Sequence, residues 1–311
     1  MPRWPFIVVS NSELDAAKQC PHKHYLAYRE RWASPGFSPA LSKGILWHAV
    51  LEEHYKAIQA EATDRERRGT IAAILMEVAR VRPDEADLIA WMYDGYEELY
   101  GLDPQWKILE VEGQRLIRLP TSTGRPSRYW VRMRFDLLVE ETLVVMGRQR
   151  KARLTLVDHK SGQNLPTQKE LDLDDQFGLY TWGLRSGNED VWGSIYSAAR
   201  TQRNKTVAQP LEERFSRTPL WRTDRELETI AREAYAIAHN RYSTRTHPRH
   251  TDSDRCRWRC PYTEACLLGR KTSPAEEEQF LVSAGFRRQT EEEQLEQRGY
   301  GIAPLVPGGV T

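Results

Sequence analysis

The placement of the four cysteines constrains the fold of this chain more than any other feature of its sequence. Cys20 stands alone near the N-terminus of the 311 residues, whereas Cys256, Cys260 and Cys266 lie together near the C-terminus. Four thiolates divided in this way fit a tetrahedral metal centre, either an iron–sulfur cluster or zinc. Such a centre would join the two ends of the chain, whatever the function of the middle part.

Two disulfide bonds and four unrelated buried thiols are the alternatives to a metal centre. Four cysteines permit three pairings, but the opening residues MPRWPFIVVS are too short for an apolar signal segment. The composition is typical of intracellular proteins, where thiols stay reduced, so we expect a cytoplasmic protein. The C-terminal trio lies among arginines and a proline, and not in the apolar surroundings typical of buried free cysteines. These observations favour a metal or cluster site.

The composition sets broad limits on structure and partners. With 40% hydrophobic residues the chain can bury a substantial core, and it has no run of eighteen apolar residues that predicts a membrane span. The 45 basic residues nearly balance the 44 acidic ones, for a net charge of +1. Overall charge therefore does not indicate nucleic-acid binding, and any site for a polyanion has to be a local groove of positive potential.

The hydrophobic periodicity predicts an α/β protein. A first helix, capped by Ser10 or Ser12, is expected to reach or break near Pro21. Further helices are expected at residues 41–62, 70–80, 84–100, 171–184 and 225–241. Strands are expected at residues 107–119, 129–139, 154–159 and 191–197.

The strand at residues 154–159 ends in a combination of residues that suggests chemistry. Side chains alternate along a strand, so Asp158 and Lys160 should point to the same face. The preceding strand ends in Asp136, a second carboxylate that a hairpin can bring alongside. Paired carboxylates are suitable ligands for a hard cation such as Mg²⁺, and a neighbouring lysine can orient or deprotonate a water molecule. Glu110 and Glu112, on one face of an earlier strand, can add a carboxylate to this site, but at least one of them is expected to be solvated, so neither is assigned to it.

Taken together, the motifs resemble those of RecB-like nucleases of the PD-(D/E)XK superfamily. They occur in the same order, as Gly44-x-x-x-His48, Asp136, Asp158-x-Lys160 and Gln176-x-x-x-Tyr180. The cysteines that flank them resemble the iron–sulfur subgroup, which includes the AddB nuclease domain and the CRISPR-associated Cas-four exonucleases. The resemblance spans residues 10–266 and implies a restriction-endonuclease-like mixed sheet flanked by helices, with an iron–sulfur-clamped helical subdomain formed by the two terminal segments.

The resemblance also implies a role for each matching residue. The metal ion, Mg²⁺ or Mn²⁺, would be held by His48, Asp136, Asp158 and the backbone carbonyl of His159, with Lys160 serving the nucleophilic water. Gln176 and Tyr180 would contact DNA and support the lysine region. A 4Fe–4S cluster would be held by Cys20, Cys256, Cys260 and Cys266.

The implied domain organisation has four parts. Residues 1–40 form an N-terminal segment with the first cluster cysteine, and residues 41–245 form the nuclease core, with a helical insertion at 63–105. Residues 246–270 form the second cluster-binding segment, and residues 271–311 form a polar, flexible tail.

The function implied is a metal-dependent DNA exonuclease that acts on single-stranded DNA or duplex ends in recombination or repair. A phage or bacterial setting fits, and a helicase or recombination protein is an expected partner, because the chain has no P-loop of its own. Two alternatives remain. The chain can be a non-catalytic DNA-end-binding or scaffolding protein that keeps the nuclease fold, or a zinc-stabilised or redox-sensing module.

Overall fold

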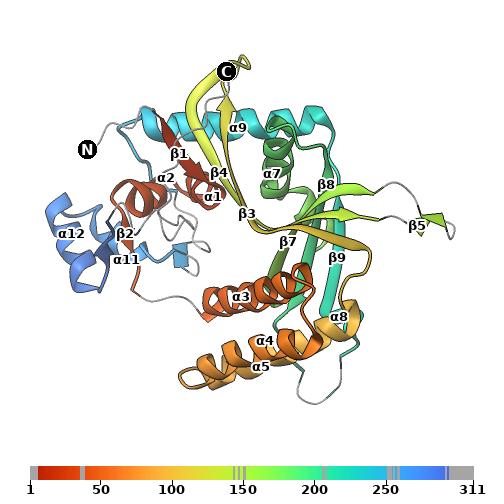
Figure 1. Ribbon diagram of the computed structural model, residues 1–311. Coiled ribbons are helices and arrows are strands. Elements are labelled where there is room, and N and C mark those ends of the chain that lie inside the picture. Colours follow the sequence, from red (N-terminus) through yellow and green to blue (C-terminus); the bar gives the residue numbers. More distant parts are fainter. Residues whose placement is uncertain are drawn as a thin grey trace. The chain divides into compact units, whose positions relative to one another are not determined.

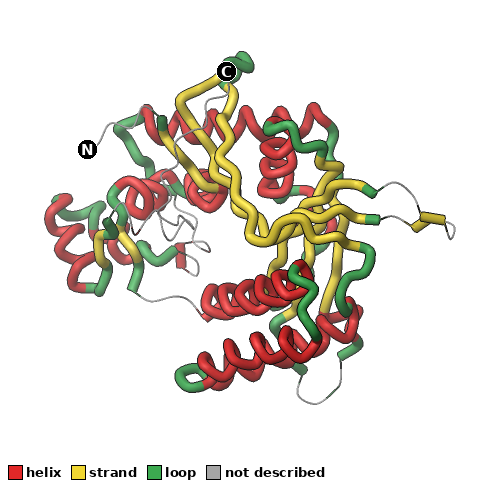
Figure 2. Tube along the Cα trace, viewed as in Figure 1, coloured by secondary structure: helices red, strands yellow, loops and turns green. Residues whose placement is uncertain are grey.

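The computed structural model describes residues 6–35, 39–142, 144, 145, 148, 149, 152–204, 207, 209–250, 254, 256, 257, 260–290 and 293 (Figures 1 and 2). The chain divides into two compact units. Unit 1 takes residues 1–37, 116–133 and 231–311, and unit 2 takes residues 38–115 and 134–230. Two long strands, β3 (Trp106–Pro120) and β4 (Pro126–Glu141), contribute residues to both units.

Unit 2 is built on a mixed sheet. The second half of β4 pairs antiparallel with β7 (Arg153–Gly162), which pairs parallel with β8 (Val191–Arg200), and β9 (Phe215–Leu220) runs antiparallel beside β8. Strand β3 pairs with β4 on a separate branch. The parallel pair requires a crossover, which contains α6 (Gln168–Asp172) and α7 (Asp175–Ser186). The α/β expectation, with a central mixed sheet flanked by helices, is confirmed.

Helices cover both faces of the unit 2 sheet. Helix α3 (Pro39–Gln59) packs against β7 and α7 packs against β8 (Figure 1). Neighbouring residues of β8 show that these are opposite faces: Ile195 belongs to the hydrophobic core that includes α3, whereas Tyr196 contacts Phe177 of α7. The same alternation sets which side chains of β7 face α3 and which face α7.

Two further helices complete the core of unit 2. Helix α4 (Asp64–Ala79) starts with a capping box made by Thr63 and Glu66, and α5 (Pro83–Tyr100) starts with a proline in its first turn, where no amide donor is needed. Both pack near α3 and bury Ile71, Ile89 and Met92 among other apolar side chains. None of the described helices combines the length and apolar character that crossing a bilayer requires.

Unit 1 brings together segments from both ends of the chain. Strand β1 (Ile7–Ser10) pairs parallel with the first half of β4, and α1 (Asn11–Gln19) follows with Ser10 as its cap. After α2 (Pro21–His24), a π-helix (Tyr25–Arg29) leads to β2 (Trp32–Ala33), which pairs with β10 (Arg287–Arg288). Unit 1 also contains α11 (Thr263–Leu268), and α9 (Asp224–Ser243) contributes residues to both units. The short elements α8 (Leu211–Arg214), β5 (Val144–Val145) and β6 (Arg148–Gln149) belong to unit 2.

Several elements differ from the sequence-based expectation. The helix expected at 171–184 is two helices, because Leu173 ends α6 and Asp174 caps α7. Strands β1 and β9 were not predicted. The segment expected as a flexible tail contains α12 (Pro274–Ser283) and β10, and its apolar residues Leu281 and Phe286 pack with the core of unit 1. The rest of the expected tail, at residues 291, 292 and 294–311, lies outside the described residues.

Candidate metal and nuclease site

His48 and Asp136 meet in unit 2, one from a helix and one from a strand. His48 lies on α3 and its Nδ1 is 3.0 Å from Oδ1 of Asp136 on β4. Gly44, one turn earlier on α3, lies where an added Cβ would be 3.8 Å from Oγ of Ser161 on β7. A small residue at this position allows α3 to lie close to the strand that carries the other expected ligands.

Asp158 and Lys160 project from β7 toward α7. Asp158 Oδ2 forms an ion pair with Lys160 Nζ, and Gln176 Nε2 of α7 donates to Asp158 Oδ1 over 3.4 Å. His159 between them has its side chain on the α3 face, and its backbone amide donates to Oδ2 of Asp136. The two oxygens of Asp136 therefore have different partners, His48 on one side and the β7 backbone on the other.

Tyr180 lies one turn after Gln176 on α7 and is buried. Its hydroxyl interacts with the backbone of Arg134 and with the charges of Asp158 and Lys160. Burial, and then the charge of Asp158, raises the pKa of Tyr180, so the hydroxyl keeps its proton at neutral pH. The structure thus brings Gln176 and Tyr180 to the Asp158–Lys160 pair, with Tyr180 enclosed by protein.

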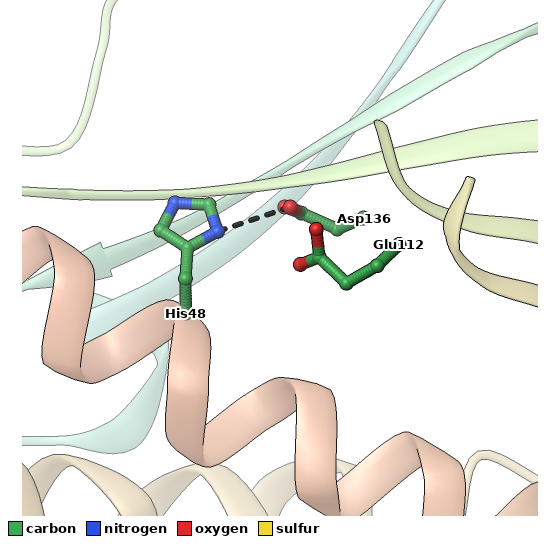
Figure 3. A group of neighbouring side chains, drawn as sticks. All are labelled: His48, Glu112 and Asp136. Carbon is green, nitrogen blue, oxygen red and sulfur yellow. Dashed lines mark hydrogen bonds and ion pairs between the residues drawn. The ribbon is translucent and has the colours of Figure 1, made fainter. Parts of the chain in front are cut away.

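Glu112 is a member of the site that the sequence did not assign. Its carboxylate, the His48 ring and the Asp136 carboxylate each offer one ligand atom, and these three atoms lie within 4.8 Å of one another (Figure 3). Glu112 has a left-handed backbone with φ of +54°, which breaks the alternation of β3. As a result Glu112 pairs with Arg134, whereas Glu110 pairs with Arg115 outside the site.

The next residue, Gly113, packs against Phe135, the residue before Asp136. A Cβ built on Gly113 would lie only 2.1 Å from Cε2 of the Phe135 ring, so the ring occupies the space of a side chain. Phe135 is fully buried immediately before Asp136. Its contact with Gly113 therefore places the Glu112 segment next to the Asp136 segment.

The electrostatics separate the two aspartates. Burial acts to raise the pKa of Asp136, but the charge and hydrogen bond of His48 outweigh it and hold this pKa well below its usual range. Burial raises the pKa of Asp158 to about 6, with the Asp136 charge adding to the rise and Lys160 opposing it. Two neighbouring carboxylates whose pKa values move apart are common at functional sites.

The carboxylates of the site raise the pKa values of the two neighbouring bases, Lys160 and His48. Burial alone would lower the pKa of Lys160, but the carboxylates of Asp158 and Asp136 outweigh it and raise the pKa above its ordinary value. The pKa of His48 is also raised, because the charge and hydrogen bond of Asp136 outweigh the effect of burial. At neutral pH Lys160 is therefore an ammonium group, able to donate hydrogen bonds and unable to accept a proton.

The donor set fits a divalent cation. Three atoms that lie within 4.8 Å of one another have a common centre at most about 2.8 Å from each (4.8 Å divided by √3), and metal–ligand bonds of about 2.0–2.2 Å require only a small contraction. The surrounding hollow is lined by His48, Glu52, Glu112, Asp136 and His159, together with apolar or aromatic side chains. One imidazole among carboxylates suits Mn²⁺ as well as Mg²⁺.

The four cysteines all belong to unit 1. Burial raises the pKa of Cys260 and of Cys266, and the charge of Cys20 raises both further, so Cys20 lies within electrostatic reach of each. Cys256 Sγ contacts the carbonyl of His250 at 3.5 Å, and Nδ1 of His250 is 3.0 Å from the carbonyl of Gln19, the residue before Cys20. Among the described residues, which include all four cysteines, no three sulfur atoms lie within 4.8 Å of one another.

Comparison with known proteins identifies the family. A sequence model described as the PD-(D/E)XK nuclease superfamily matches residues 8–267. Because this match covers most of the chain, the protein belongs to the PD-(D/E)XK nuclease superfamily, and the resemblance of its motifs to those of this superfamily is confirmed. Its mixed sheet with flanking helices is consistent with the restriction-endonuclease-like fold.

Solved structures give weaker similarities. The crystal structure of SSO0001 has 12% sequence identity and a TM-score of 0.39, over 84% of this chain and 86% of that chain. A protein described as a candidate exonuclease from Eubacterium rectale has 10% identity and a TM-score of 0.46, over 82% of this chain and 88% of that chain. The comparison with curated proteins found no match. Family membership therefore rests on the sequence match.

Proposed function

We propose that this protein is a divalent-metal-dependent deoxyribonuclease, acting as an exonuclease on single-stranded DNA or processed DNA ends. The observation that carries the proposal is the meeting of His48, Glu112 and Asp136 within 4.8 Å, next to the Asp158–Lys160 pair. Membership of a nuclease superfamily supports DNA as the substrate. The proposed ligands are His48, Asp136, Asp158 and the carbonyl of His159, with Glu112 as an additional carboxylate.

The bound cation, Mg²⁺ or Mn²⁺, would supply a Lewis acid for a phosphate oxygen and acidify a water molecule. Asp136 holds its charge at all physiological pH values because His48 lowers its pKa, so it is always available as a ligand. The amide of His159 fixes one Asp136 oxygen, which leaves the other directed toward His48 and Glu112.

Lys160 acts as a positive charge and a hydrogen-bond donor. Because its ammonium group keeps its proton, Lys160 orients the attacking water and stabilises negative charge on the phosphate, and does not serve as the general base. Gln176 fixes the Asp158 carboxylate from the α7 side. Tyr180 is enclosed by protein, so its part in the proposal is to support this pair.

We further propose that Cys20, Cys256, Cys260 and Cys266 hold a 4Fe–4S cluster in unit 1. Four thiols without a disulfide, three of them close to one another in sequence, are a suitable ligand set for such a cluster. The hydroxyl of Thr263 donates to the carbonyls of both Cys256 and Cys260, which ties these two segments together. A visible absorption spectrum of anaerobically purified protein tests this proposal, because zinc would leave the sample colourless.

Cleavage of end-labelled DNA tests the nuclease proposal. Wild-type protein should degrade single-stranded or duplex DNA from its ends with Mg²⁺ or Mn²⁺ and not with EDTA. Asp158→Ala should abolish cleavage and keep the brown chromophore, which shows that unit 1 is intact. Wild-type cleavage by Asp158→Ala contradicts the site assignment. Binding of DNA ends without cleavage in either ion supports the non-catalytic alternative.

A further inference from the structure

A buried polar cluster lies in unit 2 beneath the proposed metal ligands. The guanidinium of Arg217 on β9 makes a two-pronged ion pair with Asp103, which is completely buried, and its Nη2 also lies 3.2 Å from the hydroxyl of Tyr55 and 2.8 Å from that of Tyr96. The Tyr55 hydroxyl donates to Asp103 Oδ2 at 2.7 Å and lies 2.6 Å from the Tyr96 hydroxyl. The proposed chemistry uses none of these groups.

Tyr55 belongs to the same helix as His48. The two residues are seven positions apart on α3, which is two helical turns less about 20°, so their side chains project from the same face. Tyr55 is fully buried, whereas the side chain of His48 is 33% exposed at the site. The hydrogen bonds at the Tyr55 hydroxyl therefore fix the rotation of the helix that presents His48.

Tyr55 also contacts the strand that carries the other ligands. Its ring stacks on the ring of His159, with centroids 5.5 Å apart and an interplanar angle of 15°, and Tyr96 packs edge-on against the same imidazole. Neither ring nitrogen of His159 has a hydrogen-bond partner within the described part of the chain. Packing by the two tyrosines therefore orients the imidazole ring of His159.

The backbone of His159 serves the site on both sides of its Cα. Its amide donates to Asp136, and its carbonyl is a proposed metal ligand. The ring and these two backbone groups belong to one residue, so the packing of the ring adds to the restraint that strand pairing places on this part of β7. Tyr55 is thus part of the helix that carries His48, and it contacts His159, whose amide binds Asp136 and whose carbonyl is a proposed ligand.

We propose that Tyr55, held by Arg217 and Asp103, is a positioning residue for the metal site, and that it sets His48 and the His159 backbone together. This inference rests on the proposed metal-dependent function. An ion pair this deeply buried is weak evidence for stability, since desolvation offsets its Coulomb attraction. Groups that orient metal ligands from behind, in contrast, alter metal affinity by about 10–100-fold when removed.

Two tyrosine-to-phenylalanine variants of the full-length protein provide the test. Tyr55→Phe removes the hydroxyl and keeps the ring that stacks on His159. Tyr93→Phe is the matched control, because Tyr93 is also buried in unit 2 and its hydroxyl pairs with Nδ1 of His54 at 2.9 Å. The measurements are the melting temperature, the Kd for Mn²⁺ from the electron paramagnetic resonance of free Mn²⁺, and the Mn²⁺ dependence of DNA cleavage.

The expected result separates positioning from stability. Both variants should lose melting temperature, but only Tyr55→Phe should raise the Kd for Mn²⁺, by about tenfold or more. Saturating Mn²⁺ should restore its cleavage rate toward that of the wild type. Equal Kd values for wild type and Tyr55→Phe overturn the positioning role and leave the proposed function intact. If the wild-type protein binds Mn²⁺ no more tightly than an Asp136→Asn control does, both the proposed function and this inference are overturned.

Discussion

Replacement of Glu112 by glutamine separates metal binding from folding at this site. The carboxylate of Glu112 lies within 4.8 Å of the ligand atoms of His48 and Asp136, and its side chain is largely buried. Glu112→Gln keeps the size of the side chain and removes the negative charge. Metal binding and metal-free stability should respond differently to this change.

The expected magnitude follows from the contacts of Glu112. Removal of a group that orients a metal ligand weakens metal affinity by about 10–100-fold, which is about 1.4–2.7 kcal/mol, and removal of a ligand carboxylate should cost at least as much. In the metal-free protein the effect has the opposite sign. Burial, and then the charge of Asp136, raises the pKa of Glu112, so the ionised carboxylate disfavours folding at pH values above its pKa in the folded state. Its ion pair with Arg134, which is 47% exposed, offsets little of this cost.

The assay is Mn²⁺ titration alongside urea unfolding of the metal-free protein at pH 8. Glu112→Gln should raise the Kd for Mn²⁺ at least tenfold, with an unchanged or increased free energy of unfolding. Glu110→Gln is the matched control on the same strand, since Glu110 pairs with Arg115 away from the site, and its Kd should stay at the wild-type value. Equal Mn²⁺ affinities for the two variants would refute the assignment of Glu112 to the metal site.

Three further predictions test other parts of the account. Lys160→Met should lower the cleavage rate by about 10²–10³ without weakening Mn²⁺ binding, because the ammonium group acts on the reacting groups and repels the cation; a parallel loss of both would contradict this role. Gly113→Ala should lower the free energy of unfolding in urea by about 1–3 kcal/mol, because its Cβ would overlap the Phe135 ring. Gly69→Ala, in open space on α4, should raise that free energy by about 0.5–1 kcal/mol, and similar values for both variants would contradict the packing. Mn²⁺ affinity should fall as the pH drops below 7, by at least about tenfold per pH unit below pH 6. Both Asp158, with a pKa of about 6, and His48, with a raised pKa, must lose a proton to bind the metal, so a Kd that stays constant from pH 5 to 8 would contradict this.

Much of the core of the site was predictable because it depends on local rules. The alternation of side chains along a strand predicted that Asp158 and Lys160 share a face, and they form an ion pair. The order of strands predicted that β4 and β7 pair side by side, and the observed register of Leu137 with Val157 places Asp136 next to Asp158. These features require only the period of a strand and a short connection.

Glu112 and the C-terminal elements depend on tertiary contacts that no local pattern contains. Strand periodicity placed Glu110 and Glu112 on one face, but the left-handed backbone at Glu112 directs the two carboxylates to different partners. The Glu–Gly pair at 112–113 was the available signal, since glycine within a strand often marks a bulge. Similarly, the polar composition after residue 271 concealed α12, although Phe280, Leu281 and the following Phe286 pack with the unit 1 core.

The most direct test of the metal site is an anomalous scattering map from crystals soaked in Mn²⁺. An anomalous peak is expected between the side chains of His48, Glu112 and Asp136, next to Asp158, and it should be lost in crystals of Asp136→Asn. A peak elsewhere in the protein, with none between these side chains in well-ordered wild-type crystals, would contradict the proposed metal centre and the nuclease mechanism that depends on it.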